Sequence, residues 1–550
     1  MSSSDKPKSI LYWFRLALRT HDNPSLNHAI RRAADLKVPL YPVYLLDENH
    51  FRPDAIAAVR MQLILDALHE LNDKLNKYGS RLLVLRGTAD EVVKKADEWG
   101  IGEVVWEEES AEESRKRDTY VKKLLAEQGK KVKEMDGHML LQMDRYEKAL
   151  RGDNAPLTMI AFLTLAEKVG APDKPVNMVD WNGVAEMREG IKRNTDFDVP
   201  KTLQDVGFDE PETFGVPDPQ RFKGGEDEGL WMMEDFLKLE NGKVVARFEK
   251  PKTNPAAFDP RETTALSPYL AHGMLSCRVF FWKLKEIERK YKSHSHPPVS
   301  LIGQLMWREM THFLGRKVKN FSQMKDNPVC RQIDWDEDDD AKERFNAWLE
   351  ARTGFPWIDA LVLQLKSEGW VHHLGRHCIA CFLTRGDLYV HWEEGYRAFE
   401  RYLIDYDPCI NAFSWMWMSC SAFFSQFFRV YGPHSFPKPR DKNGDLVRRY
   451  LPVLKDMPAA YIYEPWKAPM SVQKKAQCII GKDYPKPIVD HKTISKENIG
   501  RIKAAFARNK HIDHDKRADH GKPKSKSGSR KRTYELESAR SFKKRKTTAH

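Results

Sequence analysis

The sequence lacks the features that mark membrane-spanning, secreted and disulfide-built proteins. No apolar run among the 550 residues reaches the roughly 18 residues of a membrane span, and no charged-then-apolar signal peptide opens the chain. The seven cysteines are an odd, scattered set, which predicts reduced thiols rather than a disulfide framework. Cys378 and Cys381 form one CxxC without a second, which on a helix is more typical of packing than of a metal site. We therefore expect an intracellular protein without a membrane partner.

Most of the chain also lacks a net charge. The net charge is +12, and residues 501–550 alone hold 17 lysines and arginines against 5 aspartates and glutamates, which is the same excess. A basic nucleic-acid surface on the body would therefore depend on local patterning. Residues 507–550 are predicted to form a disordered basic tail, which favours a nuclear protein, with the cytoplasm as a second location. The alternative is a solvated tail without a nuclear localisation signal.

Residues 1–135 alternate between apolar strands and amphipathic helices. Residues 8–20 begin as a strand and lead through His21-Asp22-Asn23-Pro24 into a helix. Further strands are predicted at 36–46, 81–85 and 102–106, and helices at 61–78 and 91–99. This alternation predicts an α/β domain whose mostly parallel sheet has helices on both faces. No GxGxxG follows the first strand, so the dinucleotide-binding fingerprint is absent.

The remaining chain changes character twice. Residues 136–223 include a long stretch rich in Pro, Asp and Gly, and we expect an interdomain connector there. Residues 224–506 are predicted to form an all-α domain. Its helices are expected at 227–240, 280–291, 301–313, 338–351, 357–368, 371–383, 392–403 and 415–430. Tryptophan and tyrosine are dense in this half, a pattern more often typical of a core than of a cofactor site.

Chemistry-bearing residues are concentrated between positions 369 and 417. His373 and His377 are four residues apart, so on a helix they share one face. Packing, half of a metal site and proton transfer are all open interpretations of this pair. Leu374 stands where the HExxH motif of zinc peptidases needs a glutamate, and we assign no metal.

The same segment contains an arginine followed by two carboxylates. Arg376 with Asp405 and Asp407 suggests a buried ion pair beside a polar ligand, and an ordinary salt bridge between helices is the alternative. Asn411 stands four residues before Trp415, so the two would share a helix face.

A run of hydroxyl-bearing residues at 263–270 leads into a helix. Hydroxyls and backbone N–H groups at a helix start favour an anion site suited to a pyrophosphate. A capping serine or threonine is the alternative explanation.

Taken together, these motifs resemble the photolyase/cryptochrome family. The resemblance covers nearly the whole chain up to about residue 506. Within the family, Gly-Trp-Val-His-His-Leu-Gly-Arg-His at 369–377 and the segments 381–388 and 448–454 are similar to the (6-4) photolyase and animal-type cryptochrome branch. The matching motifs are 13–15 with 21–24, 263–270, 304–309, 353–356, 369–377 and 411–417.

The resemblance implies an FAD cofactor in the helical domain and UV-damaged DNA as the partner. The implied activity is light-driven repair of (6-4) photoproducts by an electron from excited reduced FAD, with a histidine donating a proton. The alternative is a cryptochrome, a blue-light receptor or transcriptional regulator with signalling partners, and a dual role is compatible with both. The implied FAD-binding residues are Lys250, Thr263, Thr264, Ala265, Leu266, Ser267, Gln304, Arg376, Asp405, Asp407 and Asn411.

The resemblance also assigns aromatic and histidine residues. Trp415, Trp392 and Trp335 match an electron-hopping chain from flavin to surface, and Tyr389 matches its terminal member. Each ring alone is more typical of a core. His373 and His377 match the histidines that face the lesion, with His373 as the proton donor. Trp307 and Trp417 match wall residues for a flipped-out lesion.

Three positions depart from the family pattern. Leu16-Ala17 replaces a frequent Lys-Gly, Phe413 replaces a small residue near the flavin, and 107–113 is unusually acidic. These departures leave open whether an antenna chromophore, a deazaflavin or a folate, also binds. We expect a monomer.

Overall fold

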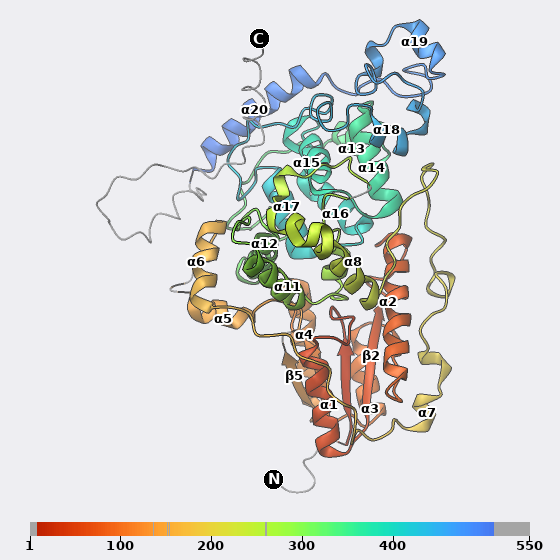
Figure 1. The fold of residues 1–550 in the computed structure, drawn as a ribbon, viewed down its shortest axis with the longest axis vertical. Helices are drawn as coiled ribbons and strands as arrows, with labels where there is room; N and C mark the ends of the chain where they lie inside the picture. The colour runs from red at the N-terminus through yellow and green to blue at the C-terminus, as the bar shows by residue number, and fades with distance from the viewer. Residues whose placement is uncertain (1–7, 136, 151, 153, 259–260, 511–550) are drawn as a thin grey trace, which may run out of the picture.

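The computed structural model describes residues 8–510 except 136, 151, 153, 259 and 260. Figure 1 shows an α/β unit at one end of the long axis and a helical unit at the other. Within the described residues, none of the helices combines the length and the apolar character that a membrane crossing requires. The predicted tail from residue 507 lies almost entirely outside this part of the chain, and helix α20 (His491–Arg508) extends to its first residues.

A five-stranded parallel sheet, in the order β3-β2-β1-β4-β5, confirms the predicted α/β fold. Strand β1 is central, and Ile10 pairs in register with Leu40 on one side and Glu103 on the other. Its alternate residues point to opposite faces, so Tyr12 joins one hydrophobic cluster and Trp13 joins another. The elements are β1 (Ile10–Phe14), α1 (Pro24–Leu36), β2 (Leu40–Asp47), α2 (Ala58–Asn76), β3 (Leu83–Gly87), α3 (Ala89–Glu98), β4 (Glu103–Glu107), α4 (Glu112–Glu127) and β5 (Lys131–Met135).

Two of these elements were not predicted. Helix α4 is highly charged and buries few side chains, so its apolar periodicity is weak. Strand β5 has the sequence Lys-Val-Lys-Glu-Met and forms the edge of the sheet, where polar side chains are tolerated. The second strand begins at Leu40 rather than at residue 36, because Leu36 still closes α1.

The segment between the two units is partly helical. Helices α5 (Met143–Ala149) and α6 (Met159–Val169) pack on the helical unit, with the Phe162 and Phe313 rings 6.2 Å apart. After α6 the chain is mostly irregular as far as residue 225, apart from the short α7 (Glu189–Lys192), and runs along the side of the α/β unit (Figure 1).

Helices dominate the second half, which confirms the predicted all-α domain. The predicted helix at 415–430 is wrong. Asp407 caps a helix that starts at Pro408, a start signal missed in the sequence, and the chain leaves the helix after Met418. The helices are α8 (Glu226–Lys238), α9 (Lys243–Arg247), α10 (Ser267–Ala271), α11 (Cys277–Lys290), α12 (Leu301–Lys317), α13 (Asp339–Leu349), α14 (Pro356–Glu368), α15 (His373–Cys381), α16 (Trp392–Tyr402), α17 (Pro408–Met418), α18 (Asp445–Tyr450) and α19 (Met470–Lys475), besides α20.

The two units share buried polar contacts. Asp22 and Arg278 form an ion pair at 2.7 Å, and both side chains are almost completely buried. Glu226 accepts hydrogen bonds from the backbone N–H groups of Thr20 and His21. The larger hydrophobic cluster also contains residues from both units, so the helical unit completes one face of the sheet.

Candidate functional site

The two predicted histidines lie side by side at the start of α15. His373 is the first residue of the helix, and its ring centroid is 5.7 Å from that of His377 in a T-shaped arrangement. His377 Nδ1 lies 3.2 Å from the Tyr431 hydroxyl. His372 caps the helix through Nδ1, and its Nε2 lies 2.9 Å from the Thr253 hydroxyl. His372, Thr253 and Tyr431 were not predicted from the sequence, although His372 directly precedes the pair.

The electrostatic surroundings keep these histidines neutral. Burial lowers the pKa of His377 to about 3, and the cations of Lys250, Arg385 and Arg376 act in the same direction. The pKa of His373 is also well below its ordinary value, because of burial and of Lys250. The positive end of the α15 dipole also disfavours a positive charge on His373. A positive imidazole at this place therefore requires a bound anion.

Arg376 and Asp405 form the predicted ion pair. Arg376 Nη1 and Nη2 donate to the two carboxylate oxygens at 3.1 and 2.7 Å, and the Asp405 side chain is 3% exposed. Arg376 Nε donates to the Val371 carbonyl, which fixes the plane of the guanidinium.

Asn411 lies on α17 with a fixed amide orientation. Its Nδ2 donates to the Tyr396 carbonyl at 3.0 Å, so the nitrogen and oxygen positions follow from the hydrogen bond. Among the described residues no partner is recorded for its Oδ1, which leaves an acceptor for a ligand.

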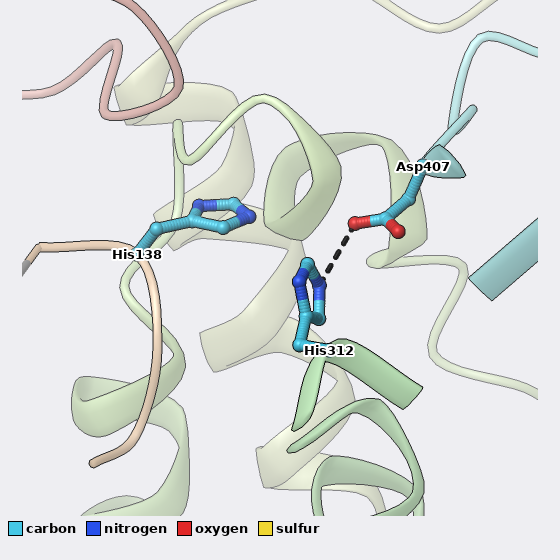
Figure 2. Close-up of side chains that lie close together, drawn as sticks. All are labelled: His138, His312 and Asp407. Atoms are coloured by element: carbon cyan, nitrogen blue, oxygen red, sulfur yellow. Dashed lines mark ion pairs between the residues drawn. The ribbon is translucent and has the colours of Figure 1, made fainter. Parts of the chain in front are cut away.

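Asp407 faces a cluster that the sequence did not suggest. One of its oxygens accepts from the Ile410 N–H, and the other lies 2.9 Å from His312 Nε2. Figure 2 shows His138 on the other side of the His312 ring. Although burial opposes ionisation, His312 lowers the pKa of Asp407 to about 2. Burial, Arg308 and His312 lower the pKa of His138 well below its ordinary value.

The residues predicted to hold phosphates form a turn before α10. Ala265 has a φ of 51°, and Leu266 follows in the right-handed helical region, an alternation that favours anion-binding N–H groups. Ser267 Oγ accepts from Trp370 Nε1 at 3.1 Å, and Thr264 Oγ1 accepts from Leu266 N at 3.4 Å. Thr263 is half-buried beside them.

Gln304 and Lys250 are held by backbone contacts. Gln304 Nε2 donates to the Pro298 carbonyl at 3.0 Å. The Lys250 backbone N–H donates to the Val299 carbonyl, and burial and Arg376 lower the pKa of its ammonium group to about 8. No ion pair of Lys250 is found within residues 8–510 as far as they are described.

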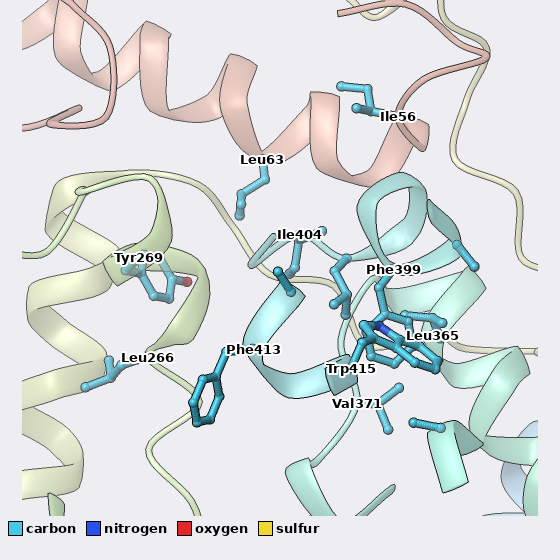
Figure 3. Close-up of a cluster of buried hydrophobic side chains, with 14 of the residues drawn as sticks. Ile56, Leu63, Leu266, Tyr269, Leu365, Val371, Phe399, Ile404, Phe413 and Trp415 are labelled. Atoms are coloured by element: carbon cyan, nitrogen blue, oxygen red, sulfur yellow. The ribbon is translucent and has the colours of Figure 1, made fainter. Parts of the chain in front are cut away.

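The predicted electron donors are buried, and two of them, Trp415 and Trp392, are placed by α16. Trp415 packs against Phe399 at a centroid distance of 4.9 Å (Figure 3), and a Cβ at Gly395 would come within 2.0 Å of its ring. Trp392 lies one turn from Gly395 on α16. The ring centroids of Trp335 and Tyr389 lie 4.8 Å apart. The guanidinium carbon of Arg501 lies 3.6 Å from the centroid of the Tyr389 ring.

These tryptophans share one further property. In the described structure the indole N–H groups of Trp335, Trp392 and Trp415 have no hydrogen-bond partner. Buried N–H groups normally have one, and each exception costs about 1–3 kcal/mol. An oxidised indole without a neighbouring base keeps its proton, which favours transfer of the hole to the next ring.

The two predicted wall residues lie together. The Trp307 and Trp417 ring centroids are 5.6 Å apart at 86°, and both side chains are half-buried. Phe413 lies 5.8 Å from each of them and stacks on Phe423 at 4.4 Å. Phe413 therefore extends the aromatic wall.

Two carboxylates of the acidic segment 107–113 are accommodated within the α/β unit. Burial raises the pKa of Glu107 to about 7, and the Tyr12 hydroxyl donates to its carboxylate. Glu109 is paired with Arg117 at 2.8 Å and with Arg15 at 3.2 Å.

Comparison with known proteins identifies the fold and the cofactor. Residues 10–177 match the family model described as DNA photolyase, and residues 301–504 match the FAD binding domain of DNA photolyase. A (6-4)DNA photolyase of Oryza sativa subsp. japonica is 43% identical over 532 residues, which cover 94% of this chain and 93% of the relative. The chain belongs to the photolyase/cryptochrome family.

Other members of the photolyase/cryptochrome family are as similar. Cryptochrome-2 of Gallus gallus is 43% identical over 499 residues, 90% of this chain and 83% of the relative. The crystal structure of a bacterial class III photolyase from Agrobacterium tumefaciens superposes with a TM-score of 0.73 at 26% identity, covering 92% of this chain and 99% of that one. Identity alone therefore does not separate repair from signalling.

The site residues fit the FAD that the family binds. Lys250 and Arg376 are two cations that lie near one carboxylate, Asp405. This excess of positive charge suits an anionic ligand. The Asn411 amide oxygen and the turn at 263–267 supply an acceptor and N–H donors for its polar atoms.

FAD affinity should fall as the pH rises above about 8. In the FAD-free protein the lowered pKa of Lys250 lets the ammonium group lose its charge near pH 8, whereas a bound anion raises that pKa. Binding then takes up a proton, so affinity drops by up to about tenfold per pH unit until the pKa of the bound form is reached. Titration of FAD-free protein, followed by flavin fluorescence between pH 7 and 10, measures this.

The matched pair of variants is Lys250→Met and Lys252→Met. Lys250→Met should bind FAD more weakly at pH 7 and show a flat profile. Lys252, which is exposed and paired with Glu249 at 2.8 Å, should be dispensable. A parent-like slope in Lys250→Met would place the titrating group elsewhere.

Proposed function

We propose that this protein repairs (6-4) pyrimidine photoproducts in DNA in a light-dependent reaction. The observation that carries this proposal is the pair of imidazoles at His373 and His377, at the entrance of α15. The rice relative with 43% identity is named a (6-4)DNA photolyase, which supports the same choice.

Recognition of the lesion rests on the aromatic wall. A base extruded from the duplex loses its stacking partners, and an aromatic face restores about 1–3 kcal/mol per base. Trp307 and Trp417, nearly perpendicular to each other, offer two such faces.

Proton transfer is the task of the histidine pair. Reduced FAD, when bound and excited, would supply the electron for breaking the photoproduct linkage and would recover it afterwards, so that the repair is redox-neutral. His373 donates the proton that the lesion needs as its hydroxyl group moves back. His377, held by the Tyr431 hydroxyl, acts as a positioning residue for His373.

A bound anion gives His373 the charge it needs for this role. Without bound anions, burial and Lys250 keep its pKa low. The negative charge of reduced FAD and of the damaged strand opposes the Lys250 and Arg376 cations and raises that pKa. The acid is therefore formed in the complete complex with FAD and the lesion.

A cryptochrome-type photoreceptor is the second candidate. The 43% identity with chicken cryptochrome-2 favours it, and the buried Trp415, Trp392 and Trp335 chain serves either use. Signalling proteins would then be the partners. The basic residues 501–550 support a nuclear location for both functions.

The deciding experiment uses two single-lesion oligonucleotides, one with a (6-4) photoproduct and one with a cyclobutane dimer. The FAD-loaded protein should restore the thymines of the first under blue light and not in the dark, and should leave the second unchanged. Chromatography of the digested oligonucleotide measures the product. A photoreducible protein that restores neither would be assigned to the photoreceptor class.

A further inference from the structure

Three buried side chains outside the histidine pair meet where the two units join. They are His138, which follows β5 in sequence, His312 of α12 and the cap residue Asp407 of α17 (Figure 2). Their exposed fractions are 4%, 4% and 5%. One nitrogen or oxygen atom from each lies within 4.8 Å of the others.

His312 has unmet bonding capacity. Its Nδ1 has no hydrogen-bond partner among the described residues, and the Nε2 contact with Asp407 is an ion pair without hydrogen-bond alignment. A buried imidazole with neither ring nitrogen properly bonded is uncommon in proteins. Asp407 uses one oxygen to cap α17, so its second oxygen is the one that faces the cluster.

We propose that His138, His312 and Asp407 form a binding site for a divalent metal ion of the zinc type. Two imidazoles and a carboxylate are a donor set that Zn²⁺ accepts, and three protein ligands leave a fourth position for water. Ligands about 2.0–2.2 Å from one zinc ion lie roughly 3.3 Å from each other. The cluster must therefore contract from 4.8 Å, chiefly by a movement of His138 toward the His312 and Asp407 pair, which is already at 2.9 Å.

Arg308 competes with the metal. Its Nη2 donates to His138 Nε2, so the lone pair that would bind a metal points at a guanidinium group. Its Nη1 contacts Met139 Sδ at 3.3 Å, and the Glu309 carboxylate lies 3.8 Å away as a counter-charge. Metal entry therefore requires Arg308 to release His138, and the positive charge lowers affinity for a dication. Replacement of Arg308 is therefore expected to strengthen metal binding, whereas replacement of a ligand weakens it.

The site would tie three segments together. His138 belongs to the chain that leaves the sheet, whereas His312 and Asp407 lie on two packed helices of the helical unit. A bound ion adds stability in proportion to its affinity, since it binds the folded state and not the unfolded chain. Thermal stability is thus a readout that does not depend on FAD or on light.

The experiment measures zinc binding to the full-length protein with ZnCl₂ as the probe. After dialysis against zinc and removal of loosely held ion, elemental analysis should find one zinc per chain, and zinc should raise the melting temperature. X-ray absorption should show nitrogen and oxygen ligands at roughly 2.0–2.2 Å and no sulfur shell near 2.3 Å, which would indicate the nearby thiols instead.

Five variants make the assignment specific. His312→Gln and His138→Gln should each weaken binding by at least about tenfold, as loss of a ligand or its support does. Arg308→Gln should tighten it. His294→Gln should change nothing, although His294 and His296 lie 4.5 Å apart and offer an alternative surface pair. The same holds for the combined replacement of His511, His514, His520 and His550, the histidines of the basic tail.

The outcomes separate this site from its alternatives. No retained zinc in the parent, or equal binding in all variants, would overturn the proposal and leave His312 and Asp407 as an ordinary ion pair. Loss of zinc in His294→Gln or in the tail variant would assign it to the surface. FAD content and (6-4) repair are measured in parallel, and neither His138 nor His312 belongs to the proposed repair residues, so a failure of the repair function leaves this result readable.

Discussion

His373→Ala should lose (6-4) repair by roughly 10²–10⁴-fold, the range that a positioned general acid contributes. The substitution removes the imidazole proposed to face the lesion. It should leave FAD content and lesion binding near parent levels. Position 373 is the first residue of α15, where alanine is well tolerated, and no hydrogen bond of its ring is recorded among the described residues. The measurement is the yield of restored thymines per flash on a single-lesion oligonucleotide.

The pH profile should identify the acid. His373 must carry a proton to act, so repair by the parent should fall by up to about tenfold per pH unit above its pKa in the complex. Bound anions raise that pKa from the low value that burial and Lys250 impose. His377→Ala should keep a residual activity with a shifted profile, because His377 acts through its neighbour.

Matched controls separate chemistry from folding. His296→Ala, a surface histidine of the other pair, should repair like the parent. Parent-level repair by His373→Ala would remove the acid from the mechanism and return the histidine pair to a packing role.

Trp415→Phe should slow light-driven reduction of oxidised FAD by about two orders of magnitude or more, since each ~1.4 kcal/mol added to a barrier costs tenfold in rate. A phenyl ring is much harder to oxidise than an indole. The change breaks no hydrogen bond to the described residues, because the Trp415 N–H has no partner there. Transient absorption on the FAD-loaded protein measures the rate.

Trp357→Phe is the matched control for this result. Trp357 is also fully buried, but it lies on α14, which carries none of the three donors. Both variants lose similar packing, so stability effects cancel in the comparison. Equal photoreduction in the two variants would mean that electrons reach the flavin by another route.

The sequence allowed correct predictions where the periodicity or spacing of residues within one segment indicates the structure. The parallel α/β unit, the helical half and the Arg376 to Asp405 pair all follow from apolar patterns or from charges within one segment. The edge strand β5 and the charged α4 were missed because both have weak apolar patterns. The predicted helix at 415–430 failed because the cap at Asp407 was not recognised.

Contacts between segments that are distant in the chain could not be predicted from the sequence. His138 and His312 are separated by 174 positions, and only the packing of the two units brings them together. Tyr431 reaches His377 from a loop that follows α17. The low pKa values at His373 and Lys250 depend on burial, which no linear pattern reports.

The α/β unit and the helical unit share one hydrophobic interior, so neither is an independent module. One face of the sheet is covered by the helical unit, and replacing one partner of the Asp22 to Arg278 pair while this junction stays closed would leave the other as an uncompensated buried charge. Arg278 lies between the matched family segments 10–177 and 301–504, so exchanging the first segment alone would separate Asp22 from the Arg278 with which it pairs. Recombination between relatives would preserve folding only where the crossover keeps the residues on both sides of this junction from the same parent.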